Sequence, residues 1–233
     1  MNTVFKLVGD FFSLIYPKYC SICGNSLYKN EQIVCLKCQL DFPRTRFHDD
    51  VENPVFQLFW GRVHLNMATA YCNFNKDGNF RKLIHQLKYK GRKDVGRFLG
   101  SLLGNELIKS EFFESVDCIV PVPLHPKREK QRGYNQSEWI AMGLSESMNK
   151  KYDAKNLYRS VANDTQTKKG RIERWENVED IFKLRNPELF KDKHLLLVDD
   201  VVTTGSTLEA CASTLLRAEG AKVSIACLGV AKQ

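Results

Sequence analysis

Apolar and polar positions alternate along the chain in blocks that predict strands separated by helices. Mainly apolar runs of strand length occupy residues 67–74, 116–123, 195–198 and 223–230, and 195–198 is apolar throughout. Phe80, Leu83, Ile84 and Leu87 recur at helical spacing, and further helices are expected from about Asp94, over 135–149 and from Leu208 to Gly220. Because strands and helices alternate, we expect an α/β fold with a parallel sheet covered by helices on both faces.

Three stretches lack this periodicity. Residues 41–66 contain Pro43, Pro54 and Gly61 and are interpreted as a linker, while 159–182 form a long polar excursion. Residues 124–133 follow a predicted strand and are expected to form a strongly basic loop.

The first fifteen residues have an apolar helical face formed by Leu7, Val8, Phe11, Phe12 and Ile15. Asp10 interrupts this face, and no small-residue cleavage site follows before the cysteine-rich segment. No later run approaches the roughly 18 apolar residues of a membrane-spanning helix. We therefore expect a cytoplasmic protein with no secretory signal and no integral membrane span.

Eight cysteines fall into two groups. Cys72, Cys118, Cys211 and Cys227 lie alone in apolar runs and are expected to be buried thiols. The other four form two C-x2-C pairs separated by eleven residues, and they are Cys20, Cys23, Cys35 and Cys38. Four thiolates suit a structural Zn2+ and leave no open position for a substrate, although two dithiols or chance spacing remain the alternative.

The cysteine pairs divide the chain into two predicted parts. Residues 1–60 would hold the N-terminal helix, the zinc knuckle and the linker, and residues 61–233 the α/β domain. At 233 residues the chain is long enough for one full core with a small appendage. Its net charge of +8 favours an anionic partner without choosing among nucleic acid, phosphorylated metabolites and membrane surfaces.

The most informative chemistry follows the apolar run 195–198, where Asp199 and Asp200 precede a hydroxyl-rich turn. The turn joins a strand to a helix N-terminus, so free backbone amides and the helix dipole favour an anion there. The turn consists of Thr203, Thr204, Gly205, Ser206 and Thr207. It has neither the Gly-Lys pair of nucleotide triphosphate loops nor a dinucleotide-type triple glycine, which favours a lone monophosphate.

Two carboxylates at the carboxyl end of a buried strand lie where ligands of open α/β sheets bind. Asp199 and Asp200 can accept hydrogen bonds from a ribose diol or help to hold a hydrated Mg2+. The alternative is an inert capping turn with solvated carboxylates.

This run resembles the fingerprint of type I phosphoribosyltransferases, an apolar strand followed by two acidic residues and a TTG[ST]T-like loop. The resemblance implies that Asp199 and Asp200 are the catalytic pair, holding the ribose of phosphoribosyl pyrophosphate with Mg2+. It also implies that residues 203–207 bind the 5-phosphate.

A wider resemblance connects the chain with the ComF family of competence-associated proteins. Its features are the four cysteines, the segment 87–91, the segment 120–136, and the polar residues Arg159, Thr165, Gln166, Arg171, Arg174 and Asn177. The resemblance implies a pyrophosphate loop beginning at Pro123, Leu124 and His125, with Lys127, Arg128 and Arg132 as further phosphoribosyl pyrophosphate ligands. It also implies a flexible hood over residues 163–175, carrying Lys168, Lys169, Arg171 and Arg174.

Three functional hypotheses remain open. The first is a transferase with an unknown acceptor, and the second is a phosphoribosyl pyrophosphate sensor without catalysis. The third is a factor that binds single-stranded DNA through Lys88, Lys90 and Arg92, with Tyr89 available for stacking. The ComF resemblance implies a role in DNA uptake together with a helicase. The alternative for this basic stripe, Lys88, Lys90 and Arg92, is a solvated helix face without a ligand.

Overall fold

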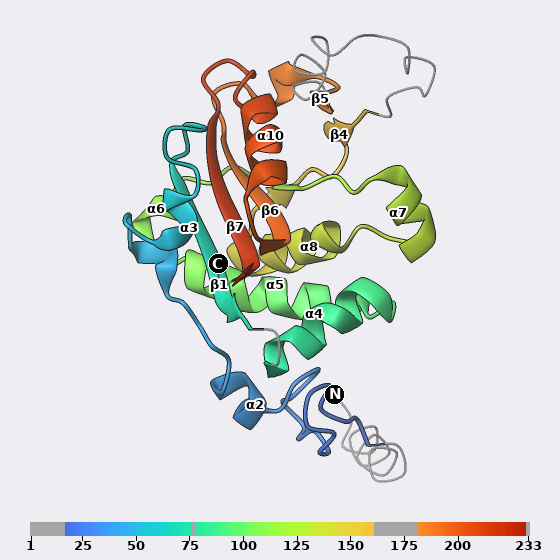
Figure 1. The fold of residues 1–233 in the computed structure, drawn as a ribbon. Coiled ribbons are helices and arrows are strands. Elements are labelled where there is room, and N and C mark those ends of the chain that lie inside the picture. Colours follow the sequence, from blue (N-terminus) through green and yellow to red (C-terminus); the bar gives the residue numbers. More distant parts are fainter. Residues whose placement is uncertain (1–16, 76–77, 161–180, 232–233) are drawn as a thin grey trace, which may run out of the picture.

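A parallel five-stranded sheet forms the centre of the computed structural model, which describes residues 17–75, 78–160 and 181–231 (Figure 1). The strand order is β1-β7-β6-β2-β3. Their bounds are β1 Met67–Phe74, β2 Cys118–Pro121, β3 Lys151–Tyr152, β6 His194–Val202 and β7 Lys222–Ala231. The α/β fold class and the predicted strands are confirmed.

Helices cover both faces of this sheet. Along β6, Leu196 and Val198 face one core, while Leu195 and Leu197 face the other, as the two-residue period of a strand requires. The first core lies under α4 (Asn79–Tyr89), α5 (Lys93–Leu107) and α8 (Gln136–Met148). The second lies under α10 (Ser206–Leu215), which covers the opposite face in Figure 1.

The segment 41–66 contains short helices although its sequence has no clear period. They are η1 (Phe47–Asp49) and α3 (Pro54–Gln57). Asn53 accepts hydrogen bonds from the amides of Val55 and Phe56, and Pro54 follows it at the first helical position. Val55 and Phe59 are fully buried in the second core, so this segment helps to build the domain; the boundary at residue 60 stays a prediction.

The basic segment 124–133 is not a continuous loop, because α7 (Pro126–Arg132) occupies most of it. The His125 side chain caps this helix, Pro126 begins it, and Gly133 ends it with a left-handed φ of 78°. The prediction of a loop was wrong because short capping signals decide this helix, not a hydrophobic period. The cations of α7 therefore lie on a helix.

The remaining elements are short. They are α2 (Leu36–Leu40), α6 (Glu111–Glu114), η3 (Pro187–Phe190) and an antiparallel pair, β4 (Leu157–Arg159) with β5 (Phe182–Leu184). The predicted N-terminal helix and the central part of the polar excursion lie outside the described residues. Within the described ranges, no helix combines the length and apolar character needed to cross a membrane.

Candidate functional site

The acidic pair lies inside the carboxyl-terminal half of β6. Asp200 is 3% exposed, and its Oδ1 lies 2.7 Å from the Nζ of Lys88 on α4. Its Oδ2 is buried and has no hydrogen-bond partner among the described residues. A buried carboxylate oxygen in this state is ready to accept a hydrogen bond or to coordinate a cation.

Asp199 is held differently. One of its oxygens accepts hydrogen bonds from the Ser137 hydroxyl and from the Asp200 amide, each at 2.8 Å. Burial and the adjacent Asp200 charge raise the pKa of the Asp199 carboxyl to about 7. The pair therefore resists carrying two full negative charges unless a further cation is bound. Its carboxylate oxygens and its charge fit a hydrated Mg2+, and the same oxygens can accept hydrogen bonds from a ribose diol.

The hydroxyl-rich turn follows directly. Gly205 has a left-handed φ of 76° and caps α10, so Ser206 and Thr207 belong to the first turn of the helix and only 203–205 form the turn itself. A small cavity of about 60 Å3 is lined by residues 201–208 together with Asp199. Amides at the start of a ten-residue helix and four side-chain hydroxyls thus surround one anion-sized space.

Two residues that the sequence analysis missed hold this turn. Arg62 donates a hydrogen bond to the Thr204 carbonyl at 2.9 Å and forms an ion pair with Glu209 on α10. The Phe59 ring packs so closely on Gly205 that an added Cβ would lie 2.9 Å from it. No local signal indicates either residue, because both come from the aperiodic segment 41–66.

A larger cavity of about 160 Å3 connects the acidic pair with the predicted pyrophosphate loop. It is lined by Lys88, Val122, Pro123, Leu124, His125, Arg128, Arg132, Gln136, Ser137, Arg159, Asp199, Asp200 and Thr207. The strand order explains this convergence, because β2 pairs with β6 and Pro121 lies opposite Val198. The cavity brings together most of the predicted ligands, whereas Thr203, Thr204, Gly205 and Ser206 line the smaller cavity and Lys127 lines neither.

Ser137 was also missed by the sequence analysis. Asn135 donates to the Val122 carbonyl at 3.0 Å and accepts from the Ser137 amide, so it joins the end of β2 to the start of α8. This link places the Ser137 hydroxyl over Asp199. Only the pairing of β2 with β6 reveals the relationship.

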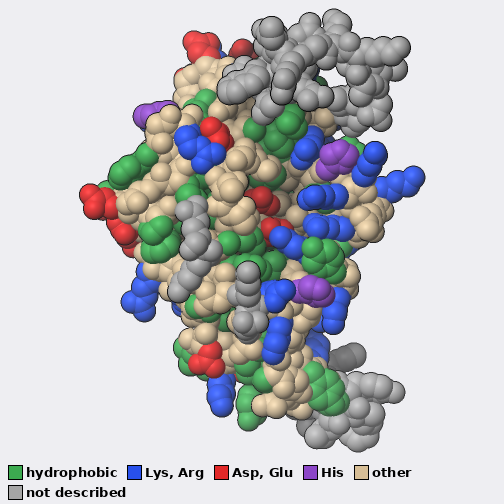
Figure 2. Space-filling view, viewed as in Figure 1, with side chains coloured by type: hydrophobic (Ala, Val, Ile, Leu, Met, Phe, Trp, Pro, Cys, Tyr) green, Lys and Arg blue, Asp and Glu red, His purple; other side chains and the backbone are tan. Residues whose placement is uncertain are grey.

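The predicted nucleic-acid stripe is not a single free face. Lys88 is directed into the acidic pair, and Arg92 forms an ion pair with Asp94 at 2.7 Å and donates to Ser21. Lys90 is exposed. Figure 2 shows Lys and Arg side chains gathered over α7, beside acidic side chains in the middle of this face of the molecule.

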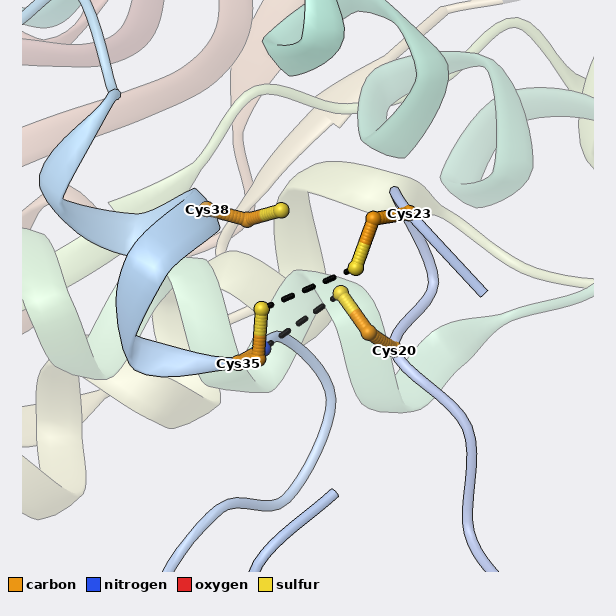
Figure 3. A group of neighbouring side chains, drawn as sticks. All are labelled: Cys20, Cys23, Cys35 and Cys38. Carbon is orange, nitrogen blue, oxygen red and sulfur yellow. Dashed lines mark hydrogen bonds between the residues drawn. The ribbon is translucent and has the colours of Figure 1, made fainter. Parts of the chain in front are cut away.

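The four cysteines of the N-terminal segment converge, as Figure 3 shows for their sulfur atoms. All four Sγ atoms lie within 4.8 Å of one another, and those of Cys23 and Cys35 are 3.7 Å apart. Four sulfurs at zinc-ligand distance from one ion would be about 3.8 Å apart in a tetrahedron. The cluster geometry therefore supports a zinc knuckle.

The environment of the thiols agrees with metal binding. Burial opposes ionisation of Cys20, but hydrogen bonds from the backbone amides of Cys23, Cys35 and Ile22 lower its pKa to about 6. Burial and the neighbouring cysteines raise the pKa of Cys38. A divalent cation would balance four thiolates that otherwise repel one another.

The hood residues Lys168, Lys169, Arg171 and Arg174 lie outside the described residues, as do Thr165, Gln166 and Asn177. Arg159, at the end of β4, is among the described residues and lines the larger cavity.

Comparison with known proteins gives consistent findings. The family model described as phosphoribosyl transferase domain matches residues 111–232. Competence protein ComFC of Bacillus subtilis (strain 168) is 35% identical over 206 residues, which cover 88% of this chain and 75% of that protein.

DNA utilization protein YhgH of Escherichia coli (strain K12) is 36% identical over 149 residues, covering 63% of this chain and 65% of its own length. Among solved structures, a glutamine phosphoribosylpyrophosphate amidotransferase from B. subtilis, complexed with ADP and GMP, aligns over 60% of this chain and 30% of its own. Its sequence identity is 19% and the TM-score is 0.42.

Proposed function

The chain belongs to the ComF family of proteins with a phosphoribosyl transferase domain, and from this we propose that it binds phosphoribosyl pyrophosphate with Mg2+. In the proposed complex, Asp199 and Asp200 contact the ribose or its hydrated Mg2+, and residues 203–207 contact the 5-phosphate. The match to YhgH spans 65% of the length of that protein, so an activity shared with whole relatives is a proposal for this chain.

The observation that carries the proposal is the state of Asp200. Its side chain is almost fully buried, Lys88 accounts for one oxygen, and the second oxygen has no partner among the described residues. A solitary buried acceptor costs free energy unless a ligand completes it. A ribose hydroxyl or a water of hydrated Mg2+ supplies the missing donor.

Other residues of the site would neutralise the negative charge of the ligand. Arg128 and Arg132 line the cavity beside Pro123, Leu124 and His125, where they can neutralise the pyrophosphate group. The backbone amide of Lys127 donates a hydrogen bond to Nδ1 of His125 at 3.1 Å. We therefore assign the Lys127 backbone to shaping this turn, while its side chain adds positive charge. The hood residues Lys168, Lys169, Arg171 and Arg174 are proposed from the family resemblance alone.

Bound Mg2+ would supply charge neutralisation for the pyrophosphate oxygens. The protein groups position the site: Ser137 holds Asp199 and Arg62 holds the phosphate turn, while Lys88 balances the charge of Asp200 in the free protein. A transferase and a phosphoribosyl pyrophosphate sensor would share all of these contacts. Release of pyrophosphate in a screen of acceptors distinguishes the first from the second.

We also propose that Zn2+ occupies the four cysteines and serves structure. The segment bearing them packs on α4, where Gln86 donates to the Ser21 carbonyl at 2.8 Å. Cys20, Cys35 and Cys38 belong to the same apolar core as α4 and α5. Zinc would therefore stabilise the packing against the C-terminal part of α4, which carries Lys88.

Calorimetry with phosphoribosyl pyrophosphate and Mg2+ tests the main proposal. The wild-type protein should bind, the Asp199→Asn/Asp200→Asn variant should lose at least tenfold in affinity, and a Glu188→Ala/Glu219→Ala variant should bind normally. Both control carboxylates are exposed, so they match the charge removed without touching the site. Absence of binding by a folded wild-type protein would refute the proposal.

We propose a role in DNA uptake, which the names of the competence and DNA utilization relatives support. Single-stranded DNA and a competence-associated helicase are proposed as partners from the family resemblance alone. Direct DNA binding is a second candidate, supported by the exposed cations Lys127, Lys130 and Lys90 around the site. A gel shift with single-stranded DNA should weaken as salt rises and weaken again in a Lys90→Ala/Lys127→Ala/Lys130→Ala variant. Retention that is insensitive to both changes would dismiss this candidate.

A further inference from the structure

A separate cavity of about 230 Å3 lies between the end of α4 and α7. Its walls include Lys88, Tyr89, Arg128, Gln131, Arg132 and Tyr134. It shares Lys88, Arg128 and Arg132 with the cavity that holds the acidic pair, so the two spaces are neighbours. Of these shared residues, Lys88 forms the ion pair with Asp200.

The charge of this cavity selects an anion. Three cationic side chains contribute to its lining, and the described residues that line it include no carboxylate. Arg132 is held in place by a hydrogen bond to the Gln136 side chain at 2.9 Å. A fixed guanidinium presents a planar set of donors that suits phosphate oxygens.

The aromatic side chains add a second selection. Tyr89 is 65% exposed, and the Arg132 guanidinium lies 5.3 Å from the centre of its ring. Tyr134 is buried, its hydroxyl donates to the Leu87 carbonyl, and the Nζ of Lys93 lies 5.3 Å from the centre of its ring. An exposed ring on a rigid base beside cations is the arrangement on which nucleobases stack.

The cavity lies between two helix ends that are joined by a hydrogen bond. Tyr89 is the last residue of α4, and Arg132 is the last residue of α7, which ends at the left-handed Gly133. The hydrogen bond from Tyr134 to Leu87 ties these two helix ends together. Preorganisation of this kind lowers the entropy cost of holding a ligand.

We propose that this cavity is a second binding site, for a nucleotide unit whose base stacks on Tyr89 and whose phosphate is held by Arg128 and Arg132. The proposal deepens the DNA-binding candidate described above and is independent of whether phosphoribosyl pyrophosphate binds next to it. The nucleotide unit is either a free mononucleotide or one residue of a single strand, since both present the same base and phosphate.

Binding is measured with two probes, dTMP by calorimetry and a fluorescent oligo-dT by anisotropy. Tyr89→Leu and Arg132→Gln should each weaken binding of at least one probe by roughly tenfold, because the first variant lacks the stacking surface and the second lacks a phosphate contact. Tyr28→Leu and Lys109→Gln are the matched controls, because Tyr28 is exposed on the cysteine segment and Lys109 is exposed just after α5, outside both cavities. Both controls should bind like the wild type.

The outcomes distinguish a free nucleotide from a single strand as the ligand, and they test this site separately from phosphoribosyl pyrophosphate binding. Binding of dTMP with these sensitivities supports the site with a free nucleotide as ligand, and sensitivity of oligo-dT alone supports it with a strand as ligand. No binding of either probe overturns the site, as does oligo-dT binding that Tyr89→Leu and Arg132→Gln leave unchanged. In the latter case DNA binding itself stands at another surface. Phosphoribosyl pyrophosphate binding, measured separately, decides the main proposed function.

Discussion

The Nζ of Lys88 lies 2.7 Å from Oδ1 of Asp200, which joins the last turn of α4 to the end of β6. The lysine side chain is 23% exposed and the aspartate side chain 5% exposed, so water screens this ion pair only in part. Lys88 thus supplies an internal cation at the place where we propose that Mg2+ and the ribose bind. Its position gives it a role inside the pocket that a count of surface charges does not suggest.

Replacing Lys88 should have opposite effects on the free and the bound protein. Lys88→Gln leaves the buried Asp200 carboxylate without its cation, which should destabilise the free protein by about 1–3 kcal/mol. Removal of a competing cation should also strengthen binding of Mg2+ with phosphoribosyl pyrophosphate. Thermal unfolding should therefore show a lower Tm without ligand and a larger rise on adding ligand than in the wild type. Lys90→Gln is the control, and equal ligand-induced shifts in both variants would contradict the idea.

The stability contributed by Asp199 should depend on pH. Burial and Asp200 raise the pKa of its carboxyl in the folded protein from 3.8 to about 7, so the folded state binds this proton more tightly than the unfolded state. The stabilisation is complete below pH 3.8 and is lost as pH rises through 7. Asp199→Asn cannot lose a proton, so its Tm should rise relative to the wild type between pH 5 and pH 8. Each kcal/mol corresponds to about 2–4 °C for a chain of this size. A difference in Tm that does not change with pH would show that the carboxyl titrates normally.

Loss of one cysteine should remove the proposed zinc. Cys38→Ser replaces one of the four converging sulfurs, and the measured zinc content should fall from about one ion per chain to near zero. The Tm should fall with it, because metal binding to the folded state contributes directly to stability. Cys118→Ala changes a thiol outside this cluster and should keep its zinc. Full zinc content in Cys38→Ser would place the metal elsewhere.

The contact between α5 and α8 should not tolerate a methyl group. A Cβ on Gly143 would lie 2.0 Å from the Arg97 carbonyl oxygen, and one on Gly100 would lie 2.2 Å from that of Ile140. Gly143→Ala must therefore push the helices apart, at a cost of about 1–3 kcal/mol or more, and should shift the Ser137 end of α8. The expected result is a lower Tm with weaker ligand binding. Gly78→Ala, whose nearest contact would be 3.6 Å away, should change the Tm little.

Much of the architecture follows from local patterns. The four long apolar runs became β1, β2, β6 and β7, and the helical spacing of Phe80, Leu83, Ile84 and Leu87 became α4. These features are readable because strand and helix periods repeat over neighbouring residues. α7 was missed because its only signals are the cap at His125, Pro126 and Gly133. The short helices of 41–66 were missed for the same reason.

The sequence by itself determined the chemistry of the site: an acidic pair before a hydroxyl-rich helix start, and four cysteines at metal-binding spacing. Only the tertiary structure decided which side chains meet there. Ser137 reaches Asp199 because α8 starts beside β2 and β2 pairs with β6, while Arg62 reaches Thr204 from a segment without a period. The ion pair between Lys88 and Asp200 likewise joins residues far apart in the sequence. Periodicity specifies which face of an element is buried, but contacts between distant residues depend on strand order and helix packing, which no local pattern encodes.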